Sequence, residues 1–219
     1  MHILITGANR GIGLALTRQY LDRGDEVTAV CRQASAELRK LDCNVIEGID
    51  VTDTDALQKL SAELKNTSID ILINNAGLLS RESLGDLSVE SIRKQFDVNA
   101  VGPLLVTDTL RPHLKRGSKV ALITSRMGSM ADNGSGAYYG YRMSKAALNA
   151  AGVSLANDLK DDGIAVGLLH PGFVQTDMVN HAGDISADEA AQRLVQRIDE
   201  LTLENTGSFR HSNGESLPF

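Results

Sequence analysis

Tyr141 is the only one of the four tyrosines that has a lysine four residues later, at Lys145. On a helix, residues at this spacing lie on one face, where their side chains can interact. An ammonium group beside a phenol favours the phenolate and lowers the phenol pKa from about 10 toward neutral pH. A phenol with such a pKa can give or take a proton at a carbonyl or alcohol oxygen. Because tyrosine and lysine also fall at this spacing by chance, the pair gains meaning only from the motifs around it.

A glycine-rich segment near the N-terminus predicts a phosphate-binding turn. Residues Thr6 to Gly13 read T-G-A-N-R-G-I-G and stand between a predicted strand and a predicted helix. Glycines let the backbone approach a pyrophosphate closely, and the helix N-terminus supplies free N–H groups. The spacing G-x-x-x-G-x-G differs from the G-x-G-x-x-G of the better-known dinucleotide fingerprint. The alternative is a turn that merely needs small residues, but the order strand, turn, helix favours a nucleotide site.

Polar and glycine-containing motifs follow three later strands. The tetrapeptide Asn74 to Gly77 follows the predicted fourth strand, Ser125 ends the fifth, and Pro171-Gly172 closes the sixth, with Thr176 four residues beyond. In an open α/β sheet, ligands bind outside the carboxyl ends of the strands. Taken singly, the tetrapeptide is typical of a turn, and the serine is typical of a cap or loop. Their convergence at one edge of the sheet predicts a substrate and cofactor site there.

The elements that position these motifs alternate along the chain, because short apolar runs predict strands and longer amphipathic stretches predict helices. The predicted strands are residues 2–6, 27–31, 44–47, 69–73, 119–124 and 164–169, and the tail 207–219 has room for one more. The predicted helices are 12–23, 34–41, 53–64, a long region 88–115 interrupted near Gly102-Pro103, the helix of Tyr141 ending near 159, and 187–201. This order predicts an α/β fold, a doubly wound parallel sheet of the Rossmann type with helices on both faces, in a single domain over residues 1–219.

Composition and charge indicate an ordinary soluble globular protein. The 219 residues are 42% hydrophobic and 23% charged, with a formal net charge of -6. This charge argues against nucleic-acid binding, and no apolar run approaches the ~18 residues of a membrane helix. An apolar strand opens the chain, so we expect no secretory signal, and we expect Cys31 and Cys43 to be reduced thiols. The histidines show no metal-ligand spacing, so we expect no metal ion. The reduced thiols and the absence of a secretory signal indicate a cytoplasmic protein.

Taken together, the motifs resemble the short-chain dehydrogenase/reductase family over nearly the whole chain. The matching motifs are T-G-x-x-x-G-x-G at Thr6 to Gly13, N-N-A-G at Asn74 to Gly77, Val98-Asn99-Ala100, Ser125 with Gly128, Tyr141-x-x-x-Lys145, and Pro171-Gly172 with Thr176.

The resemblance implies four catalytic residues. Tyr141 is similar to the family's proton donor and acceptor, and Lys145 to the residue that lowers the tyrosine pKa and holds the nicotinamide ribose hydroxyls. Ser125 resembles the group that polarises the substrate oxygen. Asn99 resembles the helix residue that anchors a water and connects Lys145 to solvent.

The cofactor contacts that we expect come from six segments. They are Gly7, Asn9, Arg10, Gly11, Ile12 and Gly13 in the first turn; Arg32 after the second strand; Asp50 and Val51 at the adenine; Asn75, Ala76 and Gly77; Tyr141 and Lys145; and Pro171, Val174 and Thr176 near the nicotinamide.

A finer resemblance is to the C-factor-like and sniffer-like carbonyl reductases, carried by the segment from Ser125 to Lys145. Ser125 and Tyr141 are 16 positions apart, a few more than in the commonest family members. Only about ten residues separate Thr176 from the last predicted helix, where many relatives carry a longer lid. A short lid predicts an open, permissive substrate site.

Cofactor choice follows from the end of the second strand. An NAD enzyme usually places an acidic residue there to accept from the ribose 2′-hydroxyl. This chain has Val30-Cys31-Arg32 instead. Arg32 and Arg10 can both reach a 2′-phosphate, which suits guanidinium forks, so NADP(H) is favoured over NAD(H). The alternative is that both are ordinary surface arginines.

These observations predict an NADPH-dependent oxidoreductase that moves a hydride between the nicotinamide and a small carbonyl or alcohol substrate. The alternative is a cofactor-binding regulatory or signalling protein of the same fold with little turnover. We expect no binding to nucleic acids or to membranes. The alanine-rich helix face after Lys145 allows close packing against a second copy, which makes a homodimer one predicted assembly.

Overall fold

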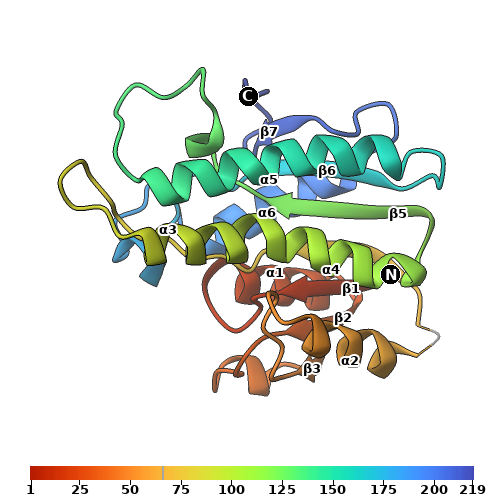
Figure 1. Cartoon of the computed structure of the whole chain (residues 1–219). Coiled ribbons are helices and arrows are strands. Elements are labelled where there is room, and N and C mark those ends of the chain that lie inside the picture. The colour runs from red at the N-terminus through yellow and green to blue at the C-terminus, as the bar shows by residue number, and fades with distance from the viewer. Residues whose placement is uncertain (66) are drawn as a thin grey trace.

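The computed structural model describes residues 1–65 and 67–219, and its centre is a seven-stranded sheet (Figure 1). The strands are β1 (His2–Thr6), β2 (Glu26–Val30), β3 (Asn44–Ile46), β4 (Ile69–Asn74), β5 (Leu114–Ile123), β6 (Ala165–His170) and β7 (Phe209–His211). Their order is β3-β2-β1-β4-β5-β6-β7, and every neighbouring pair is parallel. The direction of the order reverses between β1 and β4. Such a switch point opens a crevice at the carboxyl ends of the strands.

Helices cover both faces of the sheet. They are α1 (Gly11–Asp22), α2 (Thr54–Leu64), α3 (Val89–Phe96), α4 (Gly102–Leu110), α5 (Tyr139–Asp158) and α6 (Ala187–Asp199). In Figure 1, α4 and α5 lie on the near side of the sheet, and α1 and α6 lie behind it. Leu4 packs in the core beneath α2, α4 and α5, while Ile3 and Ile5 pack in the core beneath α1 and α6. Alternate residues of one strand therefore serve opposite cores, as the pleat of a strand requires.

These observations confirm the predicted doubly wound parallel sheet, including one short strand in the C-terminal tail. Two local predictions are wrong. The first is the helix over residues 34–41, where the structure has only a single 3₁₀ turn, Leu38–Lys40. The Ala34 N–H donates instead to the Glu47 carboxylate at 3.1 Å, and Cys31 N–H donates to Ile46 O. These bonds tie the start of the connection to the end of β3.

The second is the boundary between the helical region 88–115 and the fifth strand, whereas the interruption near Gly102-Pro103 is confirmed. A wide π-helical turn, Asp97–Val101, separates α3 from α4 just before Gly102-Pro103. The helical part ends in a 3₁₀ turn at Arg111–His113, which contains Pro112, and proline cannot continue an α-helix. Leu114 already pairs with Ile69, so β5 begins five residues before the predicted strand.

Within the described residues, no helix is both long and apolar enough to cross a lipid bilayer. Cys31 and Cys43 are both free thiols.

Candidate active site and cofactor cleft

A cleft of about 1360 Å³ opens at the carboxyl ends of the strands, where the strand order reverses. Most of the expected cofactor contacts line it: Gly7, Asn9, Arg10, Gly11, Ile12, Arg32, Asp50, Val51, Asn75, Ala76, Gly77, Tyr141, Lys145, Pro171 and Thr176. Gly13 and Val174 are not among the lining residues. The cleft also has a wall that the sequence motifs did not indicate, made by the α3 residues Val89, Glu90, Arg93 and Lys94. These residues form no motif, and only the packing of α3 brings them to the cleft.

The glycine-rich turn has the geometry of a phosphate cradle. Gly7 and Gly11 have φ angles of +66° and +52°, which favour glycine. A Cβ at Gly13 would lie 2.3 Å from the Gly7 carbonyl oxygen, so a side chain cannot fit there. Gly13 therefore shapes the turn from behind. No side chain caps the start of α1, which leaves its first N–H groups free to bind an anion.

Asn75 braces this turn from β4. Its side-chain amide donates to the Thr6 carbonyl at 3.0 Å and to the Gly7 carbonyl at 3.1 Å. The Thr6 hydroxyl accepts in turn from the backbone N–H groups of Asn75 and Ala76. The N-N-A-G segment thus holds the glycine-rich turn in place, in addition to bordering the cleft.

Ser125, Tyr141, Lys145 and Asn99 are all buried. Ser125 follows β5, and its hydroxyl oxygen accepts from the Met127 N–H at 3.1 Å, which leaves the hydroxyl proton free to donate. Gly128 lets this turn approach α5, because a Cβ there would lie 2.7 Å from the Lys145 carbonyl carbon. The Lys145 ammonium donates to the Ile123 carbonyl at 2.8 Å and lies 5.8 Å from the centre of the Tyr141 ring.

Burial shifts the pKa values of both Tyr141 and Lys145. It raises the pKa of Tyr141 to about 12, with a hydrogen bond to Ser125 acting in the opposite direction. It lowers the pKa of Lys145 to about 8. The expectation that Lys145 lowers the Tyr141 pKa is therefore not met here. The ammonium group is bonded to the Ile123 carbonyl, and desolvation of the phenol is the larger effect.

Asn99 lies in the π-helical turn and acts as a brace. Its side-chain oxygen accepts from the Leu78 N–H at 2.8 Å, and its amide donates to the Leu78 carbonyl and to the Ser144 hydroxyl. The Ser144 hydroxyl donates to the Tyr141 carbonyl at 2.8 Å. The side chain of Asn99 thus joins the loop after β4 to α5, and all its polar groups have protein partners.

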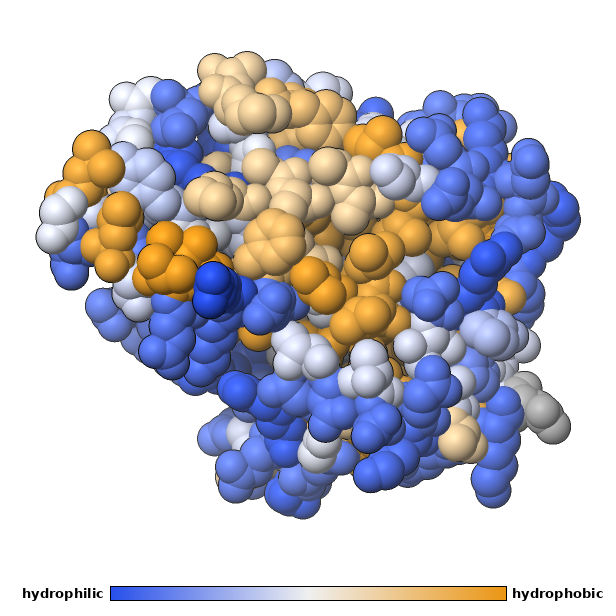
Figure 2. All heavy atoms as spheres, viewed as in Figure 1, coloured by the Kyte–Doolittle hydropathy of each residue, from blue (hydrophilic) through white to orange (hydrophobic). Residues whose placement is uncertain are grey.

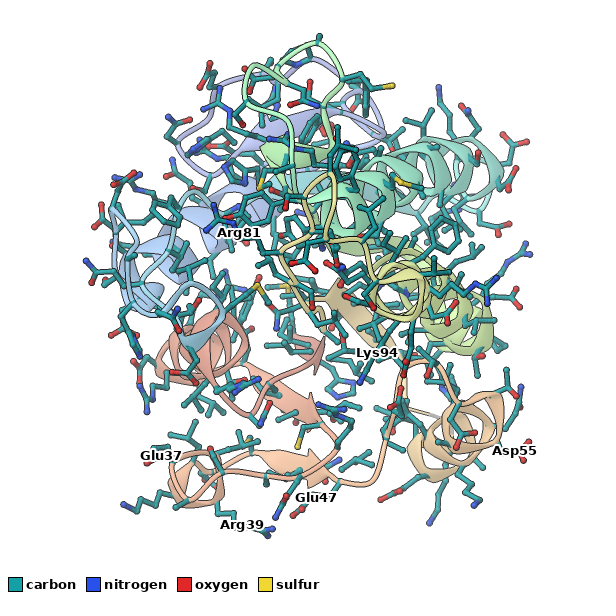
Figure 3. All side chains as sticks on the ribbon, turned by 60° about the vertical axis from the view of Figure 1, so that its left-hand side comes forward. Glu37, Arg39, Glu47, Asp55, Arg81 and Lys94 are labelled. Atoms are coloured by element: carbon teal, nitrogen blue, oxygen red, sulfur yellow. The ribbon has the colours of Figure 1, made fainter. Side chains whose placement is uncertain are left out.

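The end of the cleft near Asp50 carries two cationic side chains, those of Arg32 and Lys94. Arg32 is exposed after β2, and Arg32 and Lys94 both lower the pKa of Asp50, although the Thr52 N–H lowers it most. Lys94 reaches this region from α3 (Figure 3). Arg10 has a different partner, because its guanidinium lies 3.4 Å from the Asp177 carboxylate. Arg32 is therefore the stronger candidate for a phosphate contact.

The segment after β6 closes the cleft on one side. The backbone of Val174 pairs with that of Ile185, and the Val174 side chain is buried away from the cleft. Thr176 packs against the glycine-rich turn, where a Cβ at Gly11 would lie 3.3 Å from its methyl group. Asp177 pairs with both Arg10 and His181. As predicted, this lid is short, since α6 begins at Ala187.

Comparisons with known proteins agree with this geometry. A family model described as short chain dehydrogenase matches residues 1–187. A 1-hydroxy-2-glutathionyl-2-methyl-3-butene dehydrogenase from Rhodococcus is 40% identical over 98% of both chains. The C-signal protein of Myxococcus xanthus is 43% identical over 69% of this chain and 93% of its own.

Solved structures show the same similarity. Carbonyl reductase Sniffer of Drosophila melanogaster has a TM-score of 0.92 at 28% identity and covers 100% of this chain and 99% of its own. NADPH-bound carbonyl reductase from chicken fatty liver has a TM-score of 0.90 at 27% identity and covers 100% of this chain and 98% of its own. The fold, the arrangement of the cleft and the match over residues 1–187 lead to one conclusion: this chain belongs to the short-chain dehydrogenase family.

Proposed function

We propose that the protein is an NADPH-dependent reductase of carbonyl compounds, or a dehydrogenase of the corresponding alcohols. The observation that carries the proposal is the burial of Ser125, Tyr141 and Lys145 together at the edge of a cleft that begins with a phosphate cradle. The proposal treats residues 1–219 as one catalytic and cofactor-binding unit.

The residues of the cleft fit a dinucleotide. The uncapped start of α1 offers N–H donors to a pyrophosphate, and Gly7 and Gly11 leave room for it. Asp50 and Val51 border the adenine end, and Arg32 offers a guanidinium fork to a 2′-phosphate. Lys145, with a pKa of about 8, is mostly protonated at pH 7 and suits ribose hydroxyls. Pro171 and Thr176 border the nicotinamide end.

The bound cofactor supplies or accepts the hydride. In the direction of reduction, Tyr141 gives its phenolic proton to the substrate oxygen as negative charge develops there. The Ser125 hydroxyl, whose oxygen is already held by the Met127 N–H, donates a hydrogen bond to the same oxygen. Both side chains are more than nine-tenths buried, so solvent reaches them only from the cleft.

Met178 lines the cleft, and its apolar side chain suits apolar carbonyl compounds. Phe173 and Met178 are exposed on the lid, and Met130 is exposed on the loop that follows Ser125. The Rhodococcus relative is named for a hydroxyl compound that carries glutathione. Alcohols with a polar substituent therefore belong in a substrate panel beside simple aldehydes and ketones.

The test is turnover of such a panel by the purified protein, followed by absorbance of the reduced cofactor, with NADPH and NADH compared at equal concentration. We expect several carbonyls to be reduced with NADPH and little rate with NADH. Binding of NADPH without turnover of any member would contradict the enzymatic proposal.

A second candidate function is a regulatory or signalling protein that binds the cofactor with little turnover. The relative named C-signal, at 43% identity, is the observation that favours it. A protein that only binds has no chemical need for the buried Ser125 and Tyr141 hydroxyls. Tight NADPH binding, no turnover, and no loss of any property in Ser125→Ala would favour this second candidate.

A further inference from the structure

Glu82 is a buried carboxylate that lies outside the motifs described above. It belongs to the loop between β4 and α3, and its side chain is only 2% exposed. One oxygen accepts from the Ser91 hydroxyl and from the Gln95 amide, both at 2.7 Å. The other oxygen accepts from the backbone N–H of Gly140 at 3.2 Å, across 58 residues of sequence. All three donors are neutral, so hydrogen bonds alone compensate the buried charge.

The start of α5, where Gly140 lies, receives its capping from this loop. Ala137 and Tyr138 both have φ angles of 52°, a region that non-glycine residues rarely adopt. Tyr138 is the N-cap residue, but its side chain caps nothing, and the first turn of α5 has no acidic residue. The Glu82 backbone carbonyl accepts from the Tyr138 N–H at 2.8 Å, and the Glu82 carboxylate accepts from the Gly140 N–H. A carboxylate at a helix N-terminus also interacts favourably with the helix dipole.

This contact fixes the first turn of α5, which carries Tyr141. A Cβ at Gly140 would lie 2.4 Å from the Gln95 amide nitrogen and 3.0 Å from the Ile92 Cα, so α5 packs directly on α3. Gln95 is fully buried, and its side-chain oxygen accepts from the Ser80 N–H. The turn is therefore held from two sides, and a shift of Gly140 moves the next residue, Tyr141, relative to Ser125.

We propose that Glu82 is a positioning residue that caps α5 from the β4–α3 loop and thereby holds the Tyr141 hydroxyl at its working place beside Ser125. The proposal rests on the proposed role of Tyr141 in proton transfer. Glu82 does not act on the substrate, and its effect on the reaction passes through Tyr141.

The test begins with Glu82→Gln, which keeps the shape and removes the charge. In either orientation of the glutamine amide, its NH₂ group takes the place of one accepting oxygen. This NH₂ group then faces either the Gly140 N–H or the donors Ser91 and Gln95. We expect kcat for NADPH-dependent carbonyl reduction to fall on the order of tenfold to hundredfold, the usual effect of a small misplacement of a catalytic group. KM and the NADPH dissociation constant should stay within about twofold of the original values, since the cleft is unchanged.

Asp86→Asn is the matched control, because it makes the same change of charge at an exposed position of the same loop. It should leave kcat unchanged. Gly140→Ala is a second route to the same contact, because its methyl group displaces the first turn of α5 from Gln95. It should reproduce the loss of kcat even if Glu82→Gln does not fold.

Combination with Tyr141→Phe separates positioning from a general structural role. If Glu82 acts through the Tyr141 hydroxyl, Glu82→Gln should lower the residual kcat of Tyr141→Phe no further. The inference is overturned, while the proposed function stands, if kcat is unchanged in both Glu82→Gln and Gly140→Ala. It is also overturned if Glu82→Gln lowers the kcat of Tyr141→Phe by the same factor as it lowers the kcat of the original protein. Full activity of Tyr141→Phe by itself overturns the proposed function, and the inference with it.

Discussion

At the scale of single residues, burial governs the chemistry of the site. Tyr141 is 9% exposed and Lys145 is 5% exposed, and desolvation disfavours the charged form of each. The phenol is consequently held in its neutral, proton-bearing form, which is the form that a reductase needs. Ser125 acts in the opposite direction and lowers the Tyr141 pKa, but its effect is smaller than that of burial.

Tyr141→Phe removes the phenolic proton and keeps the buried ring. We expect kcat to fall by roughly 10²–10⁴, the usual contribution of general acid–base catalysis. Folding and NADPH affinity should largely survive. Steady-state kinetics with a reducible carbonyl, alongside a cofactor titration, measure both. Tyr138→Phe and Tyr139→Phe are the controls, and a larger loss in either of them than in Tyr141→Phe would misplace the site.

Arg32→Asp tests the cofactor preference. The carboxylate repels a 2′-phosphate but accepts from a free 2′-hydroxyl, so NADPH affinity should fall far more than NADH affinity, on the order of a hundredfold or more. Calorimetric titration with both cofactors measures the change. Arg39→Ala is the control, because Arg39 lies in the same connection but pairs with Glu47 at 2.6 Å (Figure 3). Equal NADPH and NADH affinities in the unchanged protein would contradict the assignment.

At the scale of elements, close backbone approach positions the catalytic groups. The first turn, the loop after β4, the turn after β5 and the start of α5 touch one another through Gly7, Gly13, Gly128 and Gly140. At each of these positions a Cβ would lie within 3 Å of a neighbouring atom. The glycines therefore permit contacts between elements, in addition to their role in individual turns.

Gly13→Ala tests this packing at the cofactor end. Its methyl group would lie 2.3 Å from the Gly7 carbonyl oxygen, so the turn must open. We expect NADPH affinity to fall at least tenfold, because the N–H groups that face the pyrophosphate are displaced. Fluorescence titration of NADPH measures it. Gly134→Ala is the control, since a Cβ there meets no atom within 4 Å. Retention of full NADPH affinity by Gly13→Ala would refute the cradle.

At the scale of the whole molecule, a buried histidine beneath the site links stability to pH. Burial, which is the largest cause, and the neighbouring charges of His211, Arg126 and Lys145 together lower the pKa of His170 to about 3, while Asp132 opposes them. His170 lies at the end of β6 with its ring 4.8 Å from that of His211 on β7, in an edge-to-face arrangement. The site edge of the sheet is thus built around an imidazole that stays neutral.

Acid should therefore weaken the fold through His170. In the unfolded chain its pKa returns to about 6.5, so below that pH the unfolded state binds a proton that the folded state refuses. The free energy of unfolding should fall by about 3 kcal/mol from this residue alone between pH 7 and pH 4. In His170→Phe, this part of the pH dependence of the unfolding free energy should vanish. Denaturant unfolding across that range measures it, with exposed His181→Gln as the control. An identical slope in His170→Phe would contradict the account.

The outer surface of α4 and α5 suggests how copies assemble. Figure 2 shows apolar atoms gathered across the face that these helices present. Leu104 on α4 and Met143 on α5 are more than 40% exposed, as is Phe96 at the end of α3, and Ala150 on α5 is also exposed. We expect a homodimer through this face, because exposed apolar patches of this kind mark protein interfaces. Light scattering at micromolar concentration tests the mass, and Leu104→Glu should return a dimer to monomer. A monomer in the unchanged protein would remove the prediction.

The sequence by itself determined the alternation of strands and helices, the glycine-rich turn and the residues of the candidate site. These features are local: apolar periodicity, glycine spacing and the i, i+4 pair of Tyr141 and Lys145 all act within a few residues. For the same reason, the sequence predicted the short lid after Thr176 and the short strand in the tail.

Only the tertiary structure decided what depends on contacts between distant segments. The connection after β2 is tied to the end of β3 by the Ala34 N–H and the Glu47 carboxylate, a contact across 13 residues of sequence. The Tyr141 pKa rises, because the folded chain buries the phenol, a quantity that spacing along the sequence does not contain. Glu82 meets Gly140 across 58 residues, and no local pattern marks that meeting. Burial and long-range hydrogen bonds arise when the elements pack, so they could not be predicted from the sequence.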